Sequence, residues 1–142
     1  MNDEIILNLD TCMKMSFWSK ITYPDECCGV LFGKGGGLKI DKAYLINNSL
    51  GNGDRRYGYA IDPGDLIKIE RVMAGDNSDL VGIFHSHPDA EASLSVEDEE
   101  NMIPGMAYVI LSVTGEKCRD IKVYIKKNPG ERASLLTLSY GK

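Results

Sequence analysis

The chain has 142 residues, of which 43% are hydrophobic and 26% charged, and its formal net charge is −5. This length suits one domain with a buried core, which we expect to span residues 1–142. The acidic balance argues against a nucleic-acid-binding protein, and no apolar run approaches the length of a membrane span. The first ten residues lack the segments of a signal peptide, so a cytoplasmic protein is expected. Cys12, Cys27, Cys28 and Cys118 show no CxxC spacing and are expected to be reduced thiols.

Strands and helices are expected to alternate along the chain, because short apolar runs are separated by segments with helical spacing of apolar residues. This pattern predicts an α/β (α+β) class with a mixed β-sheet flanked by helices. In chain order we expect a strand at 5–9, a helix at 10–23, strands at 27–33 and 38–47 joined by a glycine-rich hairpin turn at 34–37, a loop at 48–56, a strand at 57–61, a helix at 62–75, a strand at 80–87, a helix at 95–103, and strands at 107–113, 121–125 and 134–139.

The first expected helix has clear end signals. Asp10 is a suitable N-cap, and Pro24 ends the helix because the residue before a proline is disfavoured in helical conformation. Met13, Phe17 and Ile21 recur every four residues and give this helix one apolar face.

The chain's only two histidines, His85 and His87, stand two apart at the end of an apolar run. Side chains alternate along a strand, so both imidazoles are expected on the same side, where they can bind one metal ion. Asp98 follows on the first turn of the next expected helix and can supply a third ligand. Two histidines and one carboxylate leave a fourth position open, which is typical of a catalytic zinc site.

Two further residues have both a structural and a chemical interpretation. Ser95 and Asp98 have the spacing of a capping box, and acidic residues favour a helix N-terminus, so capping alone explains them as well as chemistry does. Glu26 stands at the start of a buried strand, where a solvated carboxylate is the ordinary interpretation. A zinc hydrolase nevertheless needs a nearby base to move protons to the leaving amine.

The combined motif resembles that of the JAMM-motif (MPN+) metalloproteases. That pattern has an upstream Glu and then His-Ser/Thr-His-Pro, six residues, Ser, two residues and Asp. Here it reads His85-Ser86-His87-Pro88, Ser95 and Asp98, with Glu26 upstream. The segment 24–33 is especially similar to that of small prokaryotic members that act on sulfur-carrier proteins. The resemblance covers roughly residues 5–126, and Leu94 departs from it where many members have proline.

The resemblance implies a JAMM/MPN fold of cytidine-deaminase-like architecture and a role for each matching residue. His85, His87 and Asp98 would hold Zn²⁺, Glu26 would activate the zinc-bound water, and Ser95 would donate a hydrogen bond to the oxyanion. The implied activity is hydrolysis of a peptide or isopeptide bond at the C-terminal glycine end of a ubiquitin-like or sulfur-carrier protein. Zinc deaminases share part of this layout but need a PCxxC segment, which is absent here. RadC-like proteins carry a similar histidine segment without the context of Glu26.

Two points stay open at the level of sequence. Arg55 and Arg56 could bind a substrate carboxylate, although paired surface arginines are more often simply solvated. A non-catalytic MPN-type interaction module with a structural zinc is the alternative to an enzyme. Glu26 and Ser95 distinguish the two, because a structural site needs neither.

Overall fold

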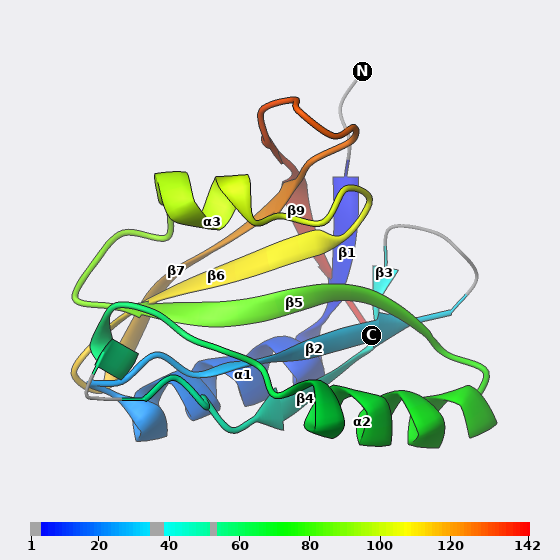
Figure 1. The fold of residues 1–142 in the computed structure, drawn as a ribbon, viewed down its shortest axis with the longest axis horizontal. Helices are drawn as coiled ribbons and strands as arrows, with labels where there is room; N and C mark the ends of the chain where they lie inside the picture. Colours follow the sequence, from blue (N-terminus) through cyan, green and yellow to red (C-terminus); the bar gives the residue numbers. More distant parts are fainter. Residues whose placement is uncertain (1–3, 35–38, 52–53) are drawn as a thin grey trace.

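The computed structural model describes residues 4–34, 39–51 and 54–142 (Figure 1). Most of these residues belong to strands and helices connected by short loops. In chain order the elements are β1 (Glu4–Asn8), α1 (Leu9–Thr22), β2 (Cys28–Gly33), β3 (Lys39–Ile40), β4 (Lys42–Ile46), the 3₁₀ helix η1 (Asp54–Arg56), α2 (Pro63–Gly75), β5 (Asp79–Pro88), α3 (Val96–Glu100), β6 (Ala107–Thr114), β7 (Lys117–Ile125), β8 (Ser134–Leu135) and β9 (Thr137–Gly141).

The strands form two sheets. The larger has six strands in the order β4-β2-β5-β6-β7-β8, and the smaller has three in the order β3-β1-β9. Only the central β5–β6 pair of the larger sheet is parallel, whereas its other neighbours are antiparallel. The predicted mixed sheet flanked by helices is therefore confirmed. Strand β5 lies inside this sheet, paired with β2 as far as His85 and with β6 as far as Pro88.

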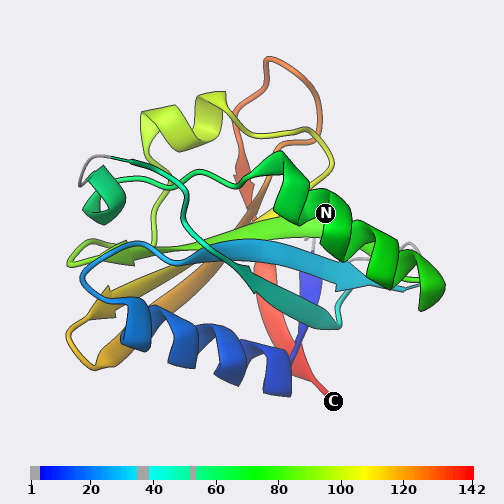
Figure 2. The same cartoon turned by 60° about the horizontal axis from the view of Figure 1, so that its bottom comes forward.

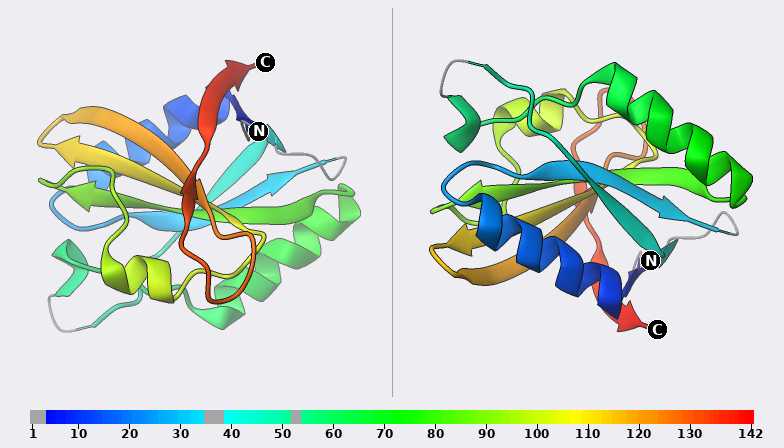
Figure 3. Two further views of the ribbon diagram at one scale, coloured as in Figure 1. Left: turned by 90° about the horizontal axis from the view of Figure 1, so that it is seen from above. Right: turned by 90° about the horizontal axis from the view of Figure 1, so that it is seen from below.

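Helices α1 and α2 cover opposite faces of the six-stranded sheet (Figure 2 and Figure 3, right). Helix α1 buries Cys12 and Met15 in a core that also contains Phe84 of β5. Helix α2 begins at its cap Asp62, as the Asp-Pro signal predicts, and buries Met73 in a second cluster on the other face. Helix α3 lies beyond the sheet on the α2 side (Figure 3, left). No helix within the described residues is long and apolar enough to span a bilayer.

Two predicted features of α1 differ in the structure. Its N-cap is Asn8, whose side chain accepts a hydrogen bond from Thr11 N at 3.0 Å, whereas Asp10 lies in the first turn. There the carboxylate of Asp10 still favours the positive end of the helix dipole. The apolar row that includes Phe17 faces solvent, because the opposite face, which includes Met15, packs on the sheet.

Two predicted strands are broken where the chain changes partner. The expected strand 38–47 is interrupted at Asp41, whose N–H donates to Phe32 O at 2.9 Å, so that β3 pairs with β1 and β4 with β2. The expected strand 134–139 is interrupted at buried Leu136, whose N–H donates to Val123 O at 2.8 Å. As a result β8 pairs with β7, and β9 pairs with β1. The antiparallel β2–β4 pair fits the predicted hairpin, but residues 35–38 of its turn lie outside the described residues.

Two further predictions of secondary structure are wrong in extent. Residues 57–61 form no strand, because side chains of the 48–49 segment take part of their backbone hydrogen bonds. The expected helix 95–103 ends at Glu100, since Asn101 caps it and donates through its side chain to Glu97 O at 3.0 Å.

Candidate metal and catalytic centre

The two histidines converge at the end of β5, as the strand alternation predicts. His85 is 1% exposed, and its Nε2 lies 3.1 Å from Nε2 of His87. The ring of Tyr59 stacks on His85 with a centroid distance of 4.5 Å and an interplanar angle of 23°. His85 is paired with β2 on one side and β6 on the other, whereas His87 is paired with Ser112 of β6.

Asp98 approaches the histidines from the first turn of α3. Its Oδ2 lies 3.4 Å from His85 Nε2 and 3.3 Å from His87 Nε2. The structure therefore brings together the three residues that the spacing singled out, from β5 and α3, which seven residues separate in the chain.

Helix α3 is short, and contacts from outside hold it in place. Lys126 is buried, and its Nζ donates to Glu99 O at 2.6 Å. Ala133 N donates to the carboxylate of Glu99 at 2.7 Å. A five-residue helix has little stability of its own, so these contacts fix the position from which Asp98 reaches the histidines.

The polar atoms of this cluster point at one another. His87 Nδ1 lies 2.9 Å from Glu91 O, a carbonyl that can only accept, so Nδ1 carries a proton. In a neutral imidazole the lone pair then sits on Nε2, which faces the carboxylate of Asp98 and Nε2 of His85. Either His85 Nε2 carries a proton and donates it to Asp98, or all three atoms act as acceptors toward one metal ion.

The pKa values agree with this interpretation. Burial alone would raise the pKa of Asp98, but hydrogen bonds from His85 and His87 outweigh it and hold that pKa well below its usual range. Burial would lower the pKa of His87, yet its contacts with Asp98 and Glu91 raise it. Burial lowers the pKa of His85. A metal ion bound here would compete with protons for the two imidazoles.

The donor separations fit a zinc ion. Two ligands at roughly 2.0–2.1 Å from a tetrahedral zinc are about 3.3–3.4 Å apart. The separations among His85 Nε2, His87 Nε2 and Asp98 Oδ2 are 3.1, 3.3 and 3.4 Å. His85 Nδ1 is buried and has no hydrogen-bond partner among the described residues, so His85 lacks the usual second contact of a ligating histidine.

Glu26 lies beside this cluster, two residues before β2. It is 5% exposed, and its carboxylate oxygen and one ring nitrogen from each of His85 and His87 lie within 4.8 Å of one another. The shorter distances involve Asp98, which leaves Glu26 as the outer carboxylate of the group. Burial raises the pKa of Glu26 to about 8, with a smaller lowering by His87 and a raising by Asp98. A carboxyl with such a pKa can gain and lose a proton near neutral pH.

Ser95 makes the capping contacts that its spacing predicts. Its Oγ accepts a hydrogen bond from Asp98 N at 2.9 Å, and its own N–H donates to Asp98 Oδ2 at 3.3 Å. This is a complete capping box, so the structural interpretation of Ser95 has direct support. The hydroxyl proton is not used by the cap, and Ser95 lines the same cleft as Glu26 and His87.

Ser86, the residue between the two histidines, ties Cys27, the residue after Glu26, to β5. It is fully buried, and its Oγ accepts a hydrogen bond from Cys27 N at 2.8 Å. Its own N–H donates to Cys27 O at 3.0 Å. Sequence reasoning gave Ser86 no role, although a serine between two strand histidines must point to the opposite face.

Asn48 is a second residue that sequence reasoning missed. It is 7% exposed, and its Nδ2 donates to Glu26 O and to Gly58 O, each at 3.0 Å. Its Oδ1 accepts from Leu50 N and Ala60 N, each at 3.1 Å. All the main hydrogen-bonding capacity of the amide is used, so Asn48 fixes the 48–60 loop to the backbone of Glu26. The sequence carries no local signal for this role, because Glu26 is 22 residues away.

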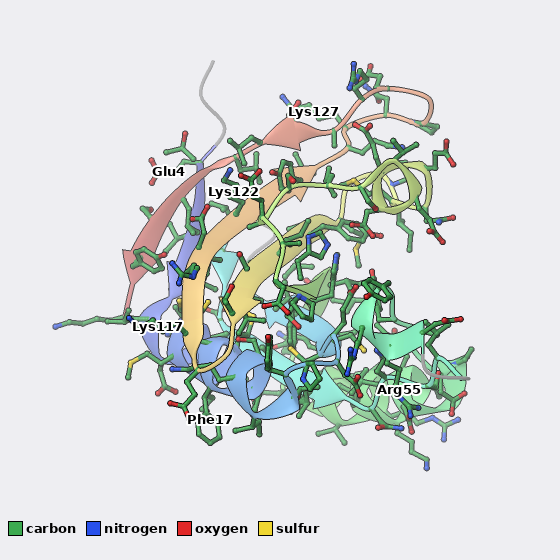
Figure 4. The ribbon with its side chains drawn as sticks, turned by 90° about the vertical axis from the view of Figure 1, so that its left-hand side faces the viewer. Glu4, Phe17, Arg55, Lys117, Lys122 and Lys127 are labelled. Carbon is green, nitrogen blue, oxygen red and sulfur yellow. The ribbon has the colours of Figure 1, made fainter. Side chains whose placement is uncertain are left out.

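The centre opens into a cleft of about 950 Å³. One wall is the segment that carries Arg56, Tyr57 and Tyr59, and the other is the segment from Pro88 to α3. The two arginines differ: Arg56 lines the cleft, whereas Arg55 lies 3.7 Å from Asp25 and donates to Leu50 O at 3.2 Å. Figure 4 shows Arg55 at the outside of the molecule.

The sequence of this chain is similar to those of several known proteins. A sequence model described as "Prokaryotic homologs of the JAB domain" matches residues 13–124. A desampylase of Haloferax volcanii is 29% identical over 113 residues, which cover 72% of this chain and 80% of that protein. A CysO-cysteine peptidase of Mycobacterium tuberculosis is 26% identical over 121 residues, which cover 84% of this chain and 81% of the peptidase.

Solved structures agree on the fold. A protein from Desulfitobacterium hafniense superposes with a TM-score of 0.83 at 23% identity, over 97% of this chain and 93% of the other. A JAB1/MPN domain protein from Archaeoglobus fulgidus superposes with a TM-score of 0.60 at 15% identity, over 96% and 98% of the two chains. At such identities the likeness concerns the fold alone.

Proposed function

This chain belongs to the prokaryotic JAB domain family, and on that premise we propose that it is a zinc-dependent hydrolase. The bond cleaved is a peptide or isopeptide bond at the C-terminal glycine end of a ubiquitin-like or sulfur-carrier protein. The observation that carries the proposal is the convergence of His85, His87 and Asp98 on one point with Glu26 beside them.

Zinc is the metal that the donor set and the family favour together. His85, His87 and Asp98 would hold the ion through two nitrogens and one oxygen, a set that leaves a position free for chemistry. Two histidines and a carboxylate also hold Fe(II) in oxygenases. The metal content of the purified protein should therefore be measured for both zinc and iron. When bound, zinc lowers the pKa of water and polarises a carbonyl as a Lewis acid.

Glu26 supplies the proton transfer that peptide hydrolysis requires. Its carboxylate would take a proton from the attacking water and then give it to the nitrogen of the leaving amine. Its place beside the histidines, out of bulk solvent, supports this role. Ser95 would donate its hydroxyl proton to the oxyanion of the tetrahedral intermediate while its oxygen keeps the cap of α3.

The wall of the cleft offers an unpaired backbone edge to a glycine tail. Gly58 O and Ala60 N are bound to Asn48, and Ala60 O accepts from Ser49 N at 2.9 Å. The N–H and C=O of Tyr59, which lies between them, have no hydrogen bond within the described residues. A tail of glycines has no side chains to recognise, so pairing with such an edge would supply the binding energy.

Arg56 would bind the carboxylate of the group released. It lines the cleft, and the structure gives it no acidic partner among the described residues, whereas Arg55 is engaged by Asp25. An arginine can bind a carboxylate through two parallel hydrogen bonds. A leaving group with its own carboxylate, such as a C-terminal cysteine, fits this feature.

The names of the relatives point to the same class of substrate. Three mycobacterial relatives are named CysO-cysteine peptidase, and two archaeal relatives are named desampylase. We therefore propose a carrier with terminal glycines, extended by one cysteine or joined to an amine, as the substrate of this chain.

The test is a carrier protein of the β-grasp type that bears one cysteine after its terminal glycines, followed by intact-mass spectrometry. Loss of the cysteine, abolished by a chelator and restored by zinc, is the expected result. Zinc binding without turnover of any such carrier would favour the alternative, a non-catalytic interaction module with a structural zinc. If the protein instead cleaves only Lys-linked ubiquitin chains, the zinc chemistry stands, but a sulfur-carrier protein is not the substrate.

A further inference from the structure

The outer face of α1 carries a row of large apolar side chains that the proposed activity does not use. Leu9, Met13, Phe17 and Ile21, here called the α1 row, are 51%, 63%, 57% and 60% exposed. They stand four residues apart and so form one ridge along the whole helix. Figure 4 shows Phe17 pointing away from the body of the molecule.

The opposite face of α1 is already packed on the sheet. Thr11, Cys12, Met15 and Ser19 are buried there, with Trp18 packed against the same core. A helix that is apolar on both faces is typical of one covered on both sides. None of the residues 4–34, 39–51 and 54–142 covers the α1 row, so within this part of the chain only one side is covered.

Helix α2 provides the contrast. Val72 on this helix is 69% exposed, but the residue four positions before it is the charged Lys68, so Val72 is not part of an apolar row. Single exposed apolar residues of this kind are normal on soluble proteins and need no partner. The continuous row on α1 is therefore a different kind of feature from the scattered residues on α2.

The charges beside the row do not select a charged partner. Within α1, Asp10 and Lys14 neutralise one another, with Nζ and Oδ2 3.3 Å apart, which leaves Lys20. The neighbouring β7 adds Arg119 and Asp120, which have opposite charges, beside Met13. An anionic membrane or a nucleic acid would need a cluster of cations here. A nearly neutral apolar ridge is instead suited to another surface of the same kind.

The area of the row is that of the centre of a dimer interface. With roughly 200 Å² for each fully exposed side chain of this size, the row presents on the order of 450 Å². A stable dimer buries about 800 Å² per partner, of which the apolar centre is only a part and the polar rim the rest. Ridges of i, i+4 residues pack against one another at about −50°, the commonest class of helix pairing.

We propose that the α1 row is the interface between two copies of this chain, related by a two-fold axis. The row meets the same row of the second copy, so one surface serves both partners. No residue of α1 lines the cleft, and both clefts therefore stay open to substrate in the dimer. The inference is independent of the proposed activity.

The test is the molar mass of the purified chain by light scattering with size-exclusion chromatography, in reducing buffer. Across about 1–100 µM, where modest interfaces dissociate, the mass should approach twice the 15.7 kDa of one chain. Phe17→Glu should weaken the dimer at least about tenfold. Val72→Glu is the matched control: it places a glutamate on α2 at an apolar residue that is 69% exposed, against 57% for Phe17, and should dimerise like the parent.

Three results would overturn the proposal. One is a monomer throughout this range. Another is a dimer that Phe17→Glu leaves unchanged, because the interface would then lie elsewhere. The third is a mass that keeps rising beyond two chains, since a two-fold interface closes. Circular dichroism and thermal melting of Phe17→Glu, expected to match the parent, show that the variant is folded.

Discussion

Replacing Asn48 by aspartate tests whether the buried amide holds the centre together. The change keeps the shape and the acceptor for Leu50 N and Ala60 N, but removes both donors, to Glu26 O and Gly58 O. Each lost hydrogen bond contributes about 0.5–1.5 kcal/mol, and a buried carbonyl left without a donor adds roughly 1–3 kcal/mol. Because Asn48 is only 7% exposed, water replaces little of this, and we expect a loss of about 2–4 kcal/mol in the free energy of unfolding.

The assay is urea unfolding, with turnover measured on the folded variant. The matched control is Asn128→Asp, because Asn128 is exposed, does not line the cleft and donates to the exposed carboxylate of Glu131 at 2.9 Å. Its effect should stay within about 0.5 kcal/mol. Since Asn48 binds the backbone of Glu26, Asn48→Asp should also lower kcat, which Asn128→Asp should not. Equal stabilities for the two variants would refute the reasoning.

Three further outcomes are expected. Ser95→Ala should lower the free energy of unfolding by about 1 kcal/mol through loss of the cap, and raise the barrier to hydrolysis by roughly 2.7–4 kcal/mol. Equally small losses of stability and activity would mean that Ser95 is a cap only. Arg56→Ala should raise KM for a substrate whose leaving group has a free carboxylate, but not for the corresponding amide. Arg55→Ala should change neither KM. If Arg56→Ala leaves the KM of both substrates unchanged, Arg56 does not bind the carboxylate of the leaving group. Burial raises the pKa of Glu26 from 4.5 to about 8, so the folded metal-free protein keeps a proton that the unfolded chain releases. Its stability should therefore fall as pH rises between these values, and melting of Glu26→Gln in chelator should show a smaller fall; an equal fall would place the titration elsewhere.

The sequence predicted well what depends on local pattern. Alternation along an apolar strand placed His85 and His87 on one side, and the Asp-Pro signal gave the start of α2. The mixed sheet followed from interspersed strands and helices. The motif also predicted that Asp98 lies with the histidines, which the structure shows at 3.3–3.4 Å.

What the sequence did not predict depends on long-range contacts. The strand expected at 38–47 is divided between two sheets, because β3 pairs with β1 and β4 pairs with β2. These partners come from other parts of the chain, so the residues of the strand itself do not indicate the division. The apolar row with Phe17 gave no sign of which face of α1 would pack, because Met15 on the other face is equally apolar. The role of Asn48 arises from four groups of the chain, one of them 22 residues away, and no local pattern indicates it.

The most direct test of the central claim compares the parent protein with Glu26→Gln, both reconstituted with zinc, in the mass assay with the cysteine-extended carrier. Gln has the shape of Glu but cannot take a proton from water. Both proteins should therefore bind one zinc per chain, while turnover by the variant falls on the order of a hundredfold or more. A variant that holds zinc and releases cysteine at the rate of the parent would contradict the account, because Glu26 would then be only a buried carboxylate beside the metal.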